Sequence, residues 1–304
     1  MKQSTVAIIG AGTVGASIAY TLITHNFVST IIMVDCDSKR CQGEIEDLSN
    51  ALPFVGNATI INGTLAQAAL ADIIIIAAGV PQKSGQTRLE LLTTNTQVVS
   101  SIIKGLQPLN KQSIIIVVTN PVDILTRLVQ ELSGLPHNQI FGSGTLLDTQ
   151  RLRGIIGKKV DIDPRSIHVF IIGEHGDSQC VAWSSGQIAG VPLAQFPGLT
   201  QESLEAMAQQ ARQKAYDIIA CKGSTSFGIA ACVSAYCQNI LFDQKRIVPV
   251  SCFVKSFGVC FSMPAVLGKN GIERIIDLSL QEDELLKLTQ SAEILQKTYE
   301  QMGK

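Results

Sequence analysis

The sequence predicts an α/β protein built on a doubly wound parallel sheet. Short, continuously apolar runs such as Ile73 to Ala77 and Ile114 to Val118 alternate with helical stretches through the first half of the chain. These runs lack the polar alternation of a strand with one wet face, so we expect strands buried on both faces. In addition, a glycine-rich turn directly follows the first apolar run and opens a helix.

The predicted elements fall into two halves of different pattern. In the first half the strands are Val6 to Ile9, Thr30 to Val34, Thr59 to Ile61, Ile73 to Ala77 and Ile114 to Val118. A helix from Val122 should end at Ser133, because Gly134 and then Pro136 follow it. After Gly142 the pattern becomes α+β, with helices at Leu146 to Ile156, Glu202 to Ala220 and Leu280 to Tyr299, and strands at Ile167 to Ile172, Val248 to Val254 and Val259 to Ser262. We therefore expect two domains, 1–142 and 143–304, packed around a shared cleft.

Composition narrows the class of partner. The formal net charge is -1, and no block of like charges marks a nucleic-acid or lipid surface. The longest apolar runs are far too short to span a bilayer, and Met1 to Ser4 lead straight into a strand. We expect a soluble, cytoplasmic protein that binds small molecules. The 8 cysteines form no Cys-x-x-Cys pair, which predicts reduced, mostly buried thiols and no metal site.

The turn Gly10-Ala11-Gly12-Thr13-Val14-Gly15 has the spacing and context of a dinucleotide site in a Rossmann domain. The first glycine allows the tight turn, the second lets backbone approach a pyrophosphate, and the third lets the helix pack on the strand. Thr13 and Val14 begin that helix, whose N-terminus favours phosphate charge. A glycine turn in an unrelated strand-helix unit is the alternative.

Asp35 follows the second strand, 20 residues after Gly15. A carboxylate there accepts hydrogen bonds from the adenosine ribose hydroxyls and repels a 2′-phosphate. NAD is therefore favoured over NADP, although the nearby Lys39 and Arg40 leave NADP as an alternative.

His175 is the candidate acid and base. It lies between Gly173 and Gly176, directly after a predicted strand, where the glycines favour an exposed side chain. A histidine titrates near neutral pH and can exchange a proton during carbonyl-alcohol interconversion, the partner event of hydride transfer. Asp148 is the candidate to orient the ring, since a carboxylate on one ring nitrogen raises the basicity of the other. The alternative is a structural histidine.

Three further residues, Arg151, Arg88 and Asn120, are candidates to meet the substrate, and Arg151 would be its anchor if the substrate is a carboxylic acid. Asp148 and Arg151 are three apart on a predicted helix and share a face, so Arg151 is placed to bind a carboxylate, or simply to form a surface ion pair. The polar, glycine-bearing loop that ends at Arg88 follows the strand at Ile73, where it could close over a substrate or merely be a solvated loop. Asn120, before Pro121, ends another strand at the same edge.

Taken together, these residues resemble the lactate/malate dehydrogenase family over nearly the whole chain, in the same order. The resemblance is carried by the glycine turn, Asp35, Gly79 to Arg88, Thr119-Asn120-Pro121, Gly142 to Thr145 with Leu147-Asp148 and Arg151, Gly173 to Ser178, and Lys222-Gly223-Ser224-Thr225.

The resemblance implies a role for each site residue. It implies that His175 donates and accepts the proton, that Asp148 orients it, that Arg151 holds the substrate carboxylate, and that Arg88 polarises the carbonyl. It also implies that Asn120 lies beside nicotinamide and substrate, with a cis bond to Pro121. Finally, it places Thr225 at the substrate and Ile229 at the nicotinamide ring.

The substrate is expected to be pyruvate or L-lactate. Malate dehydrogenases carry Arg at the position occupied here by Gln82, because a second substrate carboxylate needs a cation. A buried, unpaired carboxylate would cost several kcal/mol. Malate and larger 2-hydroxy acids remain the alternatives among enzymes, and an NAD-binding sensor module is the alternative outside them.

Arg153 and His168 resemble the effector site of allosteric bacterial lactate dehydrogenases. In those homotetramers the two positions line a pocket between subunits that binds fructose 1,6-bisphosphate, whose phosphates require such cations. The alternative is that Arg153 is a surface residue and His168 a strand residue.

Overall fold

The computed structural model describes residues 4–80 and 88–302, with the backbone alone for residues 88 and 89. The main sheet consists of β1 (Thr5–Ile9), β2 (Thr30–Val34), β3 (Thr59–Asn62), β4 (Ile73–Ile76), β5 (Ile114–Val117), β6 (Ile140–Gly142), β12 (Arg246–Val254), β13 (Val259–Gly268) and β14 (Gly271–Ile275). In this part of the chain its strand order is β14-β13-β12-β6-β5-β4-β1-β2-β3.

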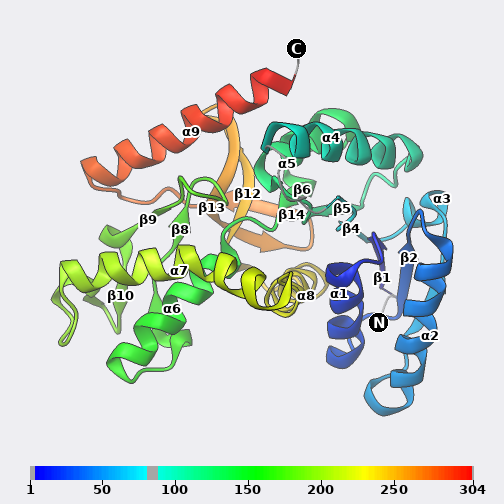
Figure 1. The fold of residues 1–304 in the computed structure, drawn as a ribbon, viewed down its shortest axis with the longest axis horizontal. Helices are drawn as coiled ribbons and strands as arrows, with labels where there is room; N and C mark the ends of the chain where they lie inside the picture. The colour runs from blue at the N-terminus through cyan, green and yellow to red at the C-terminus, as the bar shows by residue number, and fades with distance from the viewer. Residues whose placement is uncertain (1–3, 81–87, 303–304) are drawn as a thin grey trace.

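The first six strands confirm the predicted class. β1 to β6 are parallel, in the doubly wound order 3-2-1-4-5-6 of a Rossmann domain. The second half of the chain then extends this sheet, because β12 pairs antiparallel with β6, β13 with β12, and β14 with β13. Figure 1 shows β12 and β13 beside the parallel strands, under the C-terminal helix.

Helices cover both faces of the parallel strands, as their continuous apolar runs require. One face packs on α1 (Thr13–His25), α2 (Ser38–Val55) and α8 (Phe227–Leu241), and the other on α3 (Leu65–Ala68), α4 (Arg88–Gly105) and α5 (Val122–Ser133). Neighbouring residues in β1 face opposite cores: Ile8 belongs to the first and Ile9 to the second.

A third core lies between α6 (Leu146–Val160), α7 (Gln201–Lys222) and a set of short strands. These strands are β7 (Ile167–His168), β8 (Ile171–Ile172), β9 (Cys180–Val181), β10 (Gln187–Ile188) and β11 (Val191–Pro192). Single turns of 3₁₀ helix lie at His137–Gln139, Pro164–Ser166, Trp183–Ser185 and Leu193–Gln195. The last helix is α9 (Glu282–Met302), and Figure 1 shows it along one edge of the molecule.

One sequence prediction needs correction, and one helix was missed. The single strand expected from Ile167 to Ile172 is two, because the carbonyl of Val169 accepts hydrogen bonds from Arg153 Nε and Nη2 and leaves the ladder there. α8 was not predicted, because a helix buried on most sides is apolar nearly all round and shows no clear 3.6-residue period.

Other local predictions hold. α5 begins at Val122 and ends at Ser133, with Gly134 in the left-handed region at φ 71°. The eight cysteines are free, six of them buried and Cys36 and Cys221 exposed. Within residues 4–80 and 88–302, no helix is long and apolar enough to cross a membrane.

Candidate active site

In the glycine turn between β1 and α1, two of the three glycines stand where no side chain would fit. A Cβ at Gly10, whose φ is 105°, would lie 2.6 Å from the Ala78 nitrogen, and a Cβ at Gly15 would lie 1.8 Å from the Gly10 oxygen. At Gly12 the space is open, and the nearest atom is Arg40 Nη2 at 3.9 Å. The first and third glycines therefore allow close packing of backbone, whereas the second faces room for a ligand.

The N-terminus of α1 is prepared for an anion. Gly12 is the N-cap and, among the described residues, no side chain accepts a hydrogen bond from the first turn. The first turn also carries no acidic side chain. The backbone N–H groups of Thr13 and Val14, in the first turn, have no partner within the helix, so a pyrophosphate bound there would accept hydrogen bonds from them and gain from the helix dipole.

Asp35 is held rigidly beside this turn. Its Oδ2 accepts a hydrogen bond from the Ala11 N–H at 2.6 Å, and its Oδ1 accepts one from the Asp37 N–H at 2.9 Å. Partial burial opposes ionisation, but these backbone N–H groups outweigh it and hold the pKa of Asp35 below its usual range. The carboxylate stays ionised at neutral pH, which fits ribose hydroxyls and opposes a 2′-phosphate.

At the same edge of the sheet, three predicted residues come together around one ring. His175 Nδ1 lies 2.7 Å from Asp148 Oδ2, and Arg151 Nη1 donates to Asp148 Oδ1 at 3.0 Å. Asp148 and Arg151 share a face of α6, as their spacing predicted. The Asp148 and Arg151 side chains are 6% and 11% exposed, whereas His175 is 28% exposed. Solvent therefore reaches the ring of His175, whereas the side chains of Asp148 and Arg151 are nearly shielded from it.

The environments of the two titratable groups push their pKa values apart. Burial disfavours the imidazolium, but the charge of Asp148 and the hydrogen bond to it raise the pKa of His175 to about 9. Burial also disfavours the Asp148 carboxylate, yet His175 and Arg151 hold its pKa below the usual range. With Nδ1 bound to a carboxylate, Nε2 is the nitrogen free to exchange a proton.

The loop that carries His175 is anchored by the two residues that precede the histidine. The Gly173 N–H donates to the Ser262 carbonyl at 3.0 Å, and the Glu174 N–H donates to Ser291 Oγ at 2.9 Å. β13 and α9 thus fix the approach to His175. This support was not predicted, because the contacting residues are more than 80 positions away in sequence.

Sequence reasoning also missed Asp123. It lies in the first turn of α5 and is 3% exposed, and its Oδ2 accepts the His175 N–H at 2.7 Å. The available signal was a carboxylate among Val122, Ile124 and Leu125, on a helix whose other neighbours are buried.

Asn120 reaches the cleft from the end of β5. Its bond to Pro121 is cis, as the resemblance implied. Asn95, on α4 and only 2% exposed, donates through Nδ2 to the Asn120 carbonyl at 2.8 Å and accepts the Val80 N–H at 2.8 Å. One buried amide therefore ties together two segments that leave neighbouring strands β4 and β5.

A cleft of 490 Å³ lies beside His175, and among the described residues Arg151, Asp35 and the glycine turn do not line it. Its polar lining includes Asn120, Asp123, Asp148, His175 and the α7 residue Arg212, and its apolar lining comes from α4, α7 and α9, with Leu92, Ile219 and Ile294 among these residues. The cleft therefore combines a few convergent polar groups with apolar walls, which is the usual character of a small-molecule site.

Two family models together match almost the whole chain. The lactate/malate dehydrogenase NAD binding domain matches residues 4–142, and the lactate/malate dehydrogenase alpha/beta C-terminal domain matches residues 145–304. The chain belongs to the lactate/malate dehydrogenase family. It is accordingly an NAD-dependent oxidoreductase, and the open space at Gly12 with the carboxylate of Asp35 fits that cofactor.

Relatives in this family are similar over nearly their full length. The chain is 44% identical to the L-lactate dehydrogenase A of Rhizopus oryzae over 96% of this chain and 91% of that protein. It is 40% identical to the L-lactate dehydrogenase of a Synechococcus strain, over 95% and 96%. A lactate dehydrogenase from a Medee basin deep-sea metagenome library superimposes with a TM-score of 0.95 at 35% identity, over 100% of both chains.

The other residues that the resemblance assigned to the site, Thr225, Ile229, Gln82 and the Arg88 side chain, lie outside the described cleft lining or outside the described residues. Thr225 lies between α7 and α8, and Ile229 is in the first turn of α8, half-buried. That turn packs on the start of α6, since a Cβ at Gly228 would lie 2.9 Å from Leu147 Cδ1. Neither Thr225 nor Ile229 lines the described part of the 490 Å³ cleft. Gln82 lies outside the described residues, as does the side chain of Arg88.

The two effector candidates have unlike surroundings. Arg153 donates through Nε and Nη2 to the Val169 carbonyl, and its guanidinium lies 5.2 Å from the centre of the Phe170 ring. Burial lowers the pKa of Arg153 to about 10. His168 is exposed on β7. Within one subunit, Arg153 thus has two of its N–H groups bound to backbone.

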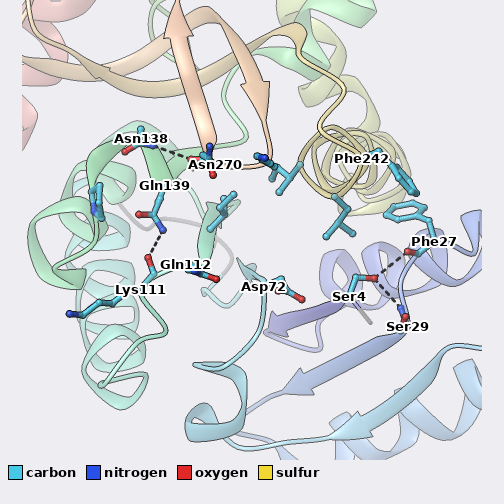
Figure 2. Close-up of a pocket in the computed structure, with 15 residues that line it drawn as sticks. Ser4, Phe27, Ser29, Asp72, Lys111, Gln112, Asn138, Gln139, Phe242 and Asn270 are labelled. Atoms are coloured by element: carbon cyan, nitrogen blue, oxygen red, sulfur yellow. Dashed lines mark hydrogen bonds between the residues drawn. The ribbon is translucent and has the colours of Figure 1, made fainter. Parts of the chain in front are cut away.

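A second cavity, of 840 Å³, lies at the opposite, amino ends of the parallel strands (Figure 2). Three of its polar side chains donate hydrogen bonds to nearby backbone carbonyls. Gln139 Nε2 donates to the Lys111 carbonyl at 2.9 Å, Asn138 Nδ2 donates to the Asn270 carbonyl at 3.0 Å, and Ser4 Oγ donates to the Phe27 carbonyl at 3.3 Å. These hydrogen bonds join neighbouring loops at the amino edge of the sheet.

Proposed function

We propose that this enzyme catalyses the reversible NADH-dependent reduction of pyruvate to L-lactate, with His175 as proton donor and acceptor. The observation that carries the proposal is the ring of His175, bound to Asp148 through Nδ1 while the residue lines the cleft. The relatives named above as L-lactate dehydrogenases support the choice of reaction.

The chain's own residues divide the work. When bound, NAD supplies the hydride chemistry at the substrate C2. Arg151 uses one N–H on Asp148, and its remaining donors bind the substrate carboxylate. His175 Nε2 gives a proton to the carbonyl oxygen, and neutral His175 takes it back in the reverse direction.

The roles of the other site residues are proposed mainly from the resemblance to the lactate/malate dehydrogenase family. Gly10, Gly12 and Gly15 form the turn that receives the NAD pyrophosphate, with Thr13 and Val14 at the phosphates, and Asp35 binds the adenosine ribose. Asn120 and Ile229 border the nicotinamide, while Thr225 and Gln82 border the substrate. Arg88 polarises the carbonyl. We also propose that residues 1–142 form the NAD-binding domain, that 143–304 form the substrate domain, and that the enzyme acts in the cytoplasm.

A substrate panel with one variant tests the reaction. NADH oxidation should be fastest with pyruvate, slower with 2-oxoisocaproate and slowest with oxaloacetate, because Gln82 offers no charge to a second carboxylate. In Gln82→Arg, kcat/KM for oxaloacetate should rise and that for pyruvate should fall. Fast oxaloacetate reduction by the unaltered enzyme would favour malate as substrate, and NADH binding without any turnover would favour a sensor module.

His175 is tested separately. In His175→Ala, turnover should fall about 10³-fold, within the range that general acid catalysis supplies, while NADH still binds. His137→Ala is the matched control, because its ring is exposed and lies against Phe253, away from the cleft. Near-normal turnover in His175→Ala would refute the role of this residue.

Arg153 and His168 are the candidate residues for an effector site between subunits. We propose a homotetramer in which fructose 1,6-bisphosphate binds Arg153 and His168, which requires one phosphate to compete with the Val169 carbonyl for the guanidinium. Fructose bisphosphate should raise the rate at subsaturating pyruvate in the unaltered enzyme but not in Arg153→Gln. An unchanged rate in both would refute it, and light scattering would give the oligomeric state.

A further inference from the structure

Asp123 is a buried carboxylate beside His175 that the proposed reaction does not use. Its Oδ2 accepts the His175 N–H at 2.7 Å, and its Oδ1 accepts Ser251 Oγ–H at 2.6 Å. The first partner belongs to the catalytic loop and the second to β12. Asp123 therefore joins α5, the main sheet and the backbone of His175 at one point.

Both partners of Asp123 are neutral donors. Among the ion pairs of residues 4–80 and 88–302, none involves Asp123. Burying a carboxylate without a paired cation is costly, and an asparagine of the same shape would accept the same N–H bond. Hydrogen bonding alone therefore does not explain why the side chain is charged.

The groups around Asp123 identify what its charge acts on. His175 and Glu174 face it from the catalytic loop, Cys252 from β12 and Cys260 from β13. Asp148 binds the His175 ring at Nδ1, and Arg151 binds Asp148. Within this set His175 is the group facing Asp123 that becomes positive.

We propose that Asp123 is a positioning residue that acts through His175: its carboxylate fixes the His175 backbone, and its negative charge favours the protonated imidazole. The proposal rests on the proposed proton transfer by His175. Asp148 then holds the ring while Asp123 holds the main chain, so two carboxylates on two helices fix one histidine.

The titration behaviour of the pair agrees with this geometry. Burial raises the pKa of Asp123 to about 6, despite the bonds from Ser251 and the His175 N–H. The pKa of His175 is raised to about 9 against the effect of burial, chiefly by Asp148 and further by the charge of Asp123. Between pH 6 and 9 both members of the pair are therefore ionised, and each stabilises the other.

The experiment compares Asp123→Asn with Ser251→Ala, which removes the other partner of Asp123 but keeps its charge. Imidazole ¹³C NMR of the free enzyme gives the pKa of His175, whose signal is assigned by its loss in His175→Ala. In Asp123→Asn the pKa should fall by about half a unit or more, as expected for a lost nearby anion. In Ser251→Ala it should stay unchanged.

A folded Asp123→Asn protein with an unchanged His175 pKa would overturn the proposal and leave Asp123 a purely structural role. If that variant does not fold, the same NMR titration of the unaltered enzyme tests the proposal. The His175 signal should show a second inflection near pH 6 as Asp123 protonates. The absence of this inflection would contradict the proposal. A shifted pKa in an enzyme that does not reduce pyruvate would instead refute the proposed function while leaving the coupling intact.

The pH profile of the reaction gives a second readout. Since pyruvate reduction needs protonated His175, the alkaline fall of kcat/KM in Asp123→Asn should move to lower pH by the same amount as the NMR pKa. A uniform loss of kcat/KM with no such movement would indicate only damage to the loop.

Discussion

The two cavities lie at opposite edges of the parallel strands and differ in what their polar groups do. At the amino edge, in the larger cavity of 840 Å³, the amides of Asn138 and Gln139 bind neighbouring carbonyls (Figure 2). At the carboxyl edge, in the cleft of 490 Å³, His175 and Asp123 have strongly shifted pKa values. Perturbed titratable groups, rather than cavity size, mark the functional edge.

Asp148→Asn, at the carboxyl edge, should have the largest effect on catalysis. The amide no longer supplies a charge to His175 Nδ1 and leaves the ring tautomer uncertain, so kcat/KM for pyruvate should fall about 10²-fold or more. The His175 pKa should also drop from about 9 toward 6.5, which moves the alkaline limb to lower pH. Asp163→Asn is the control, since that exposed carboxylate pairs with Arg165; an equal loss in both variants would contradict the account.

Arg151→Lys tests carboxylate recognition at the same edge. A lysine cannot bind Asp148 and a substrate carboxylate with one planar fork, so KM for pyruvate should rise about tenfold or more. Steady-state kinetics at saturating NADH would measure this effect. Arg165→Lys is the matched exchange at the surface, and the role of Arg151 fails if both variants keep the same KM.

Asp35→Ser tests the cofactor end of the carboxyl edge. Removing the charge should weaken NADH binding and relieve the repulsion of NADPH, so the preference for NADH should narrow about tenfold. Fluorescence titration with both cofactors would measure it. Asp37→Ser is the neighbouring control, because Asp37 caps α2 through the Arg40 N–H and should leave the preference unchanged. A preserved preference in Asp35→Ser would argue against Asp35 as the selecting residue.

At the amino edge, the expected effect on catalysis is the smallest. Gln139→Ala removes hydrogen bonds to the Lys111 and Ser113 carbonyls, so the free energy of unfolding should fall by about 1 kcal/mol. Because these bonds only join loops, kcat/KM should change less than twofold. Denaturant unfolding and steady-state kinetics would check both values, and a large kinetic effect with unchanged stability would show that this cavity serves the reaction.

The sequence alone predicted the features that depend on residues close together in the chain. The glycine turn, the end of α5 at Ser133 and the shared face of Asp148 and Arg151 each follow from contiguous residues or helical spacing. The contact of His175 with Asp123 could not be predicted in this way. The two residues are 52 positions apart, and no local sequence pattern indicates which helix packs against a given loop. α8 was missed for a related reason: burial on most sides removed its periodicity.

The carboxyl edge holds the pKa of His175 at about 9, above the ordinary value for a histidine, so the ring stays protonated at neutral pH. The most direct test is the pH dependence of kcat/KM for pyruvate reduction at saturating NADH. Activity should persist through neutral pH and fall as pH rises through about 9, where the imidazolium loses its proton. A fall centred at or below pH 6.5 would contradict the claim.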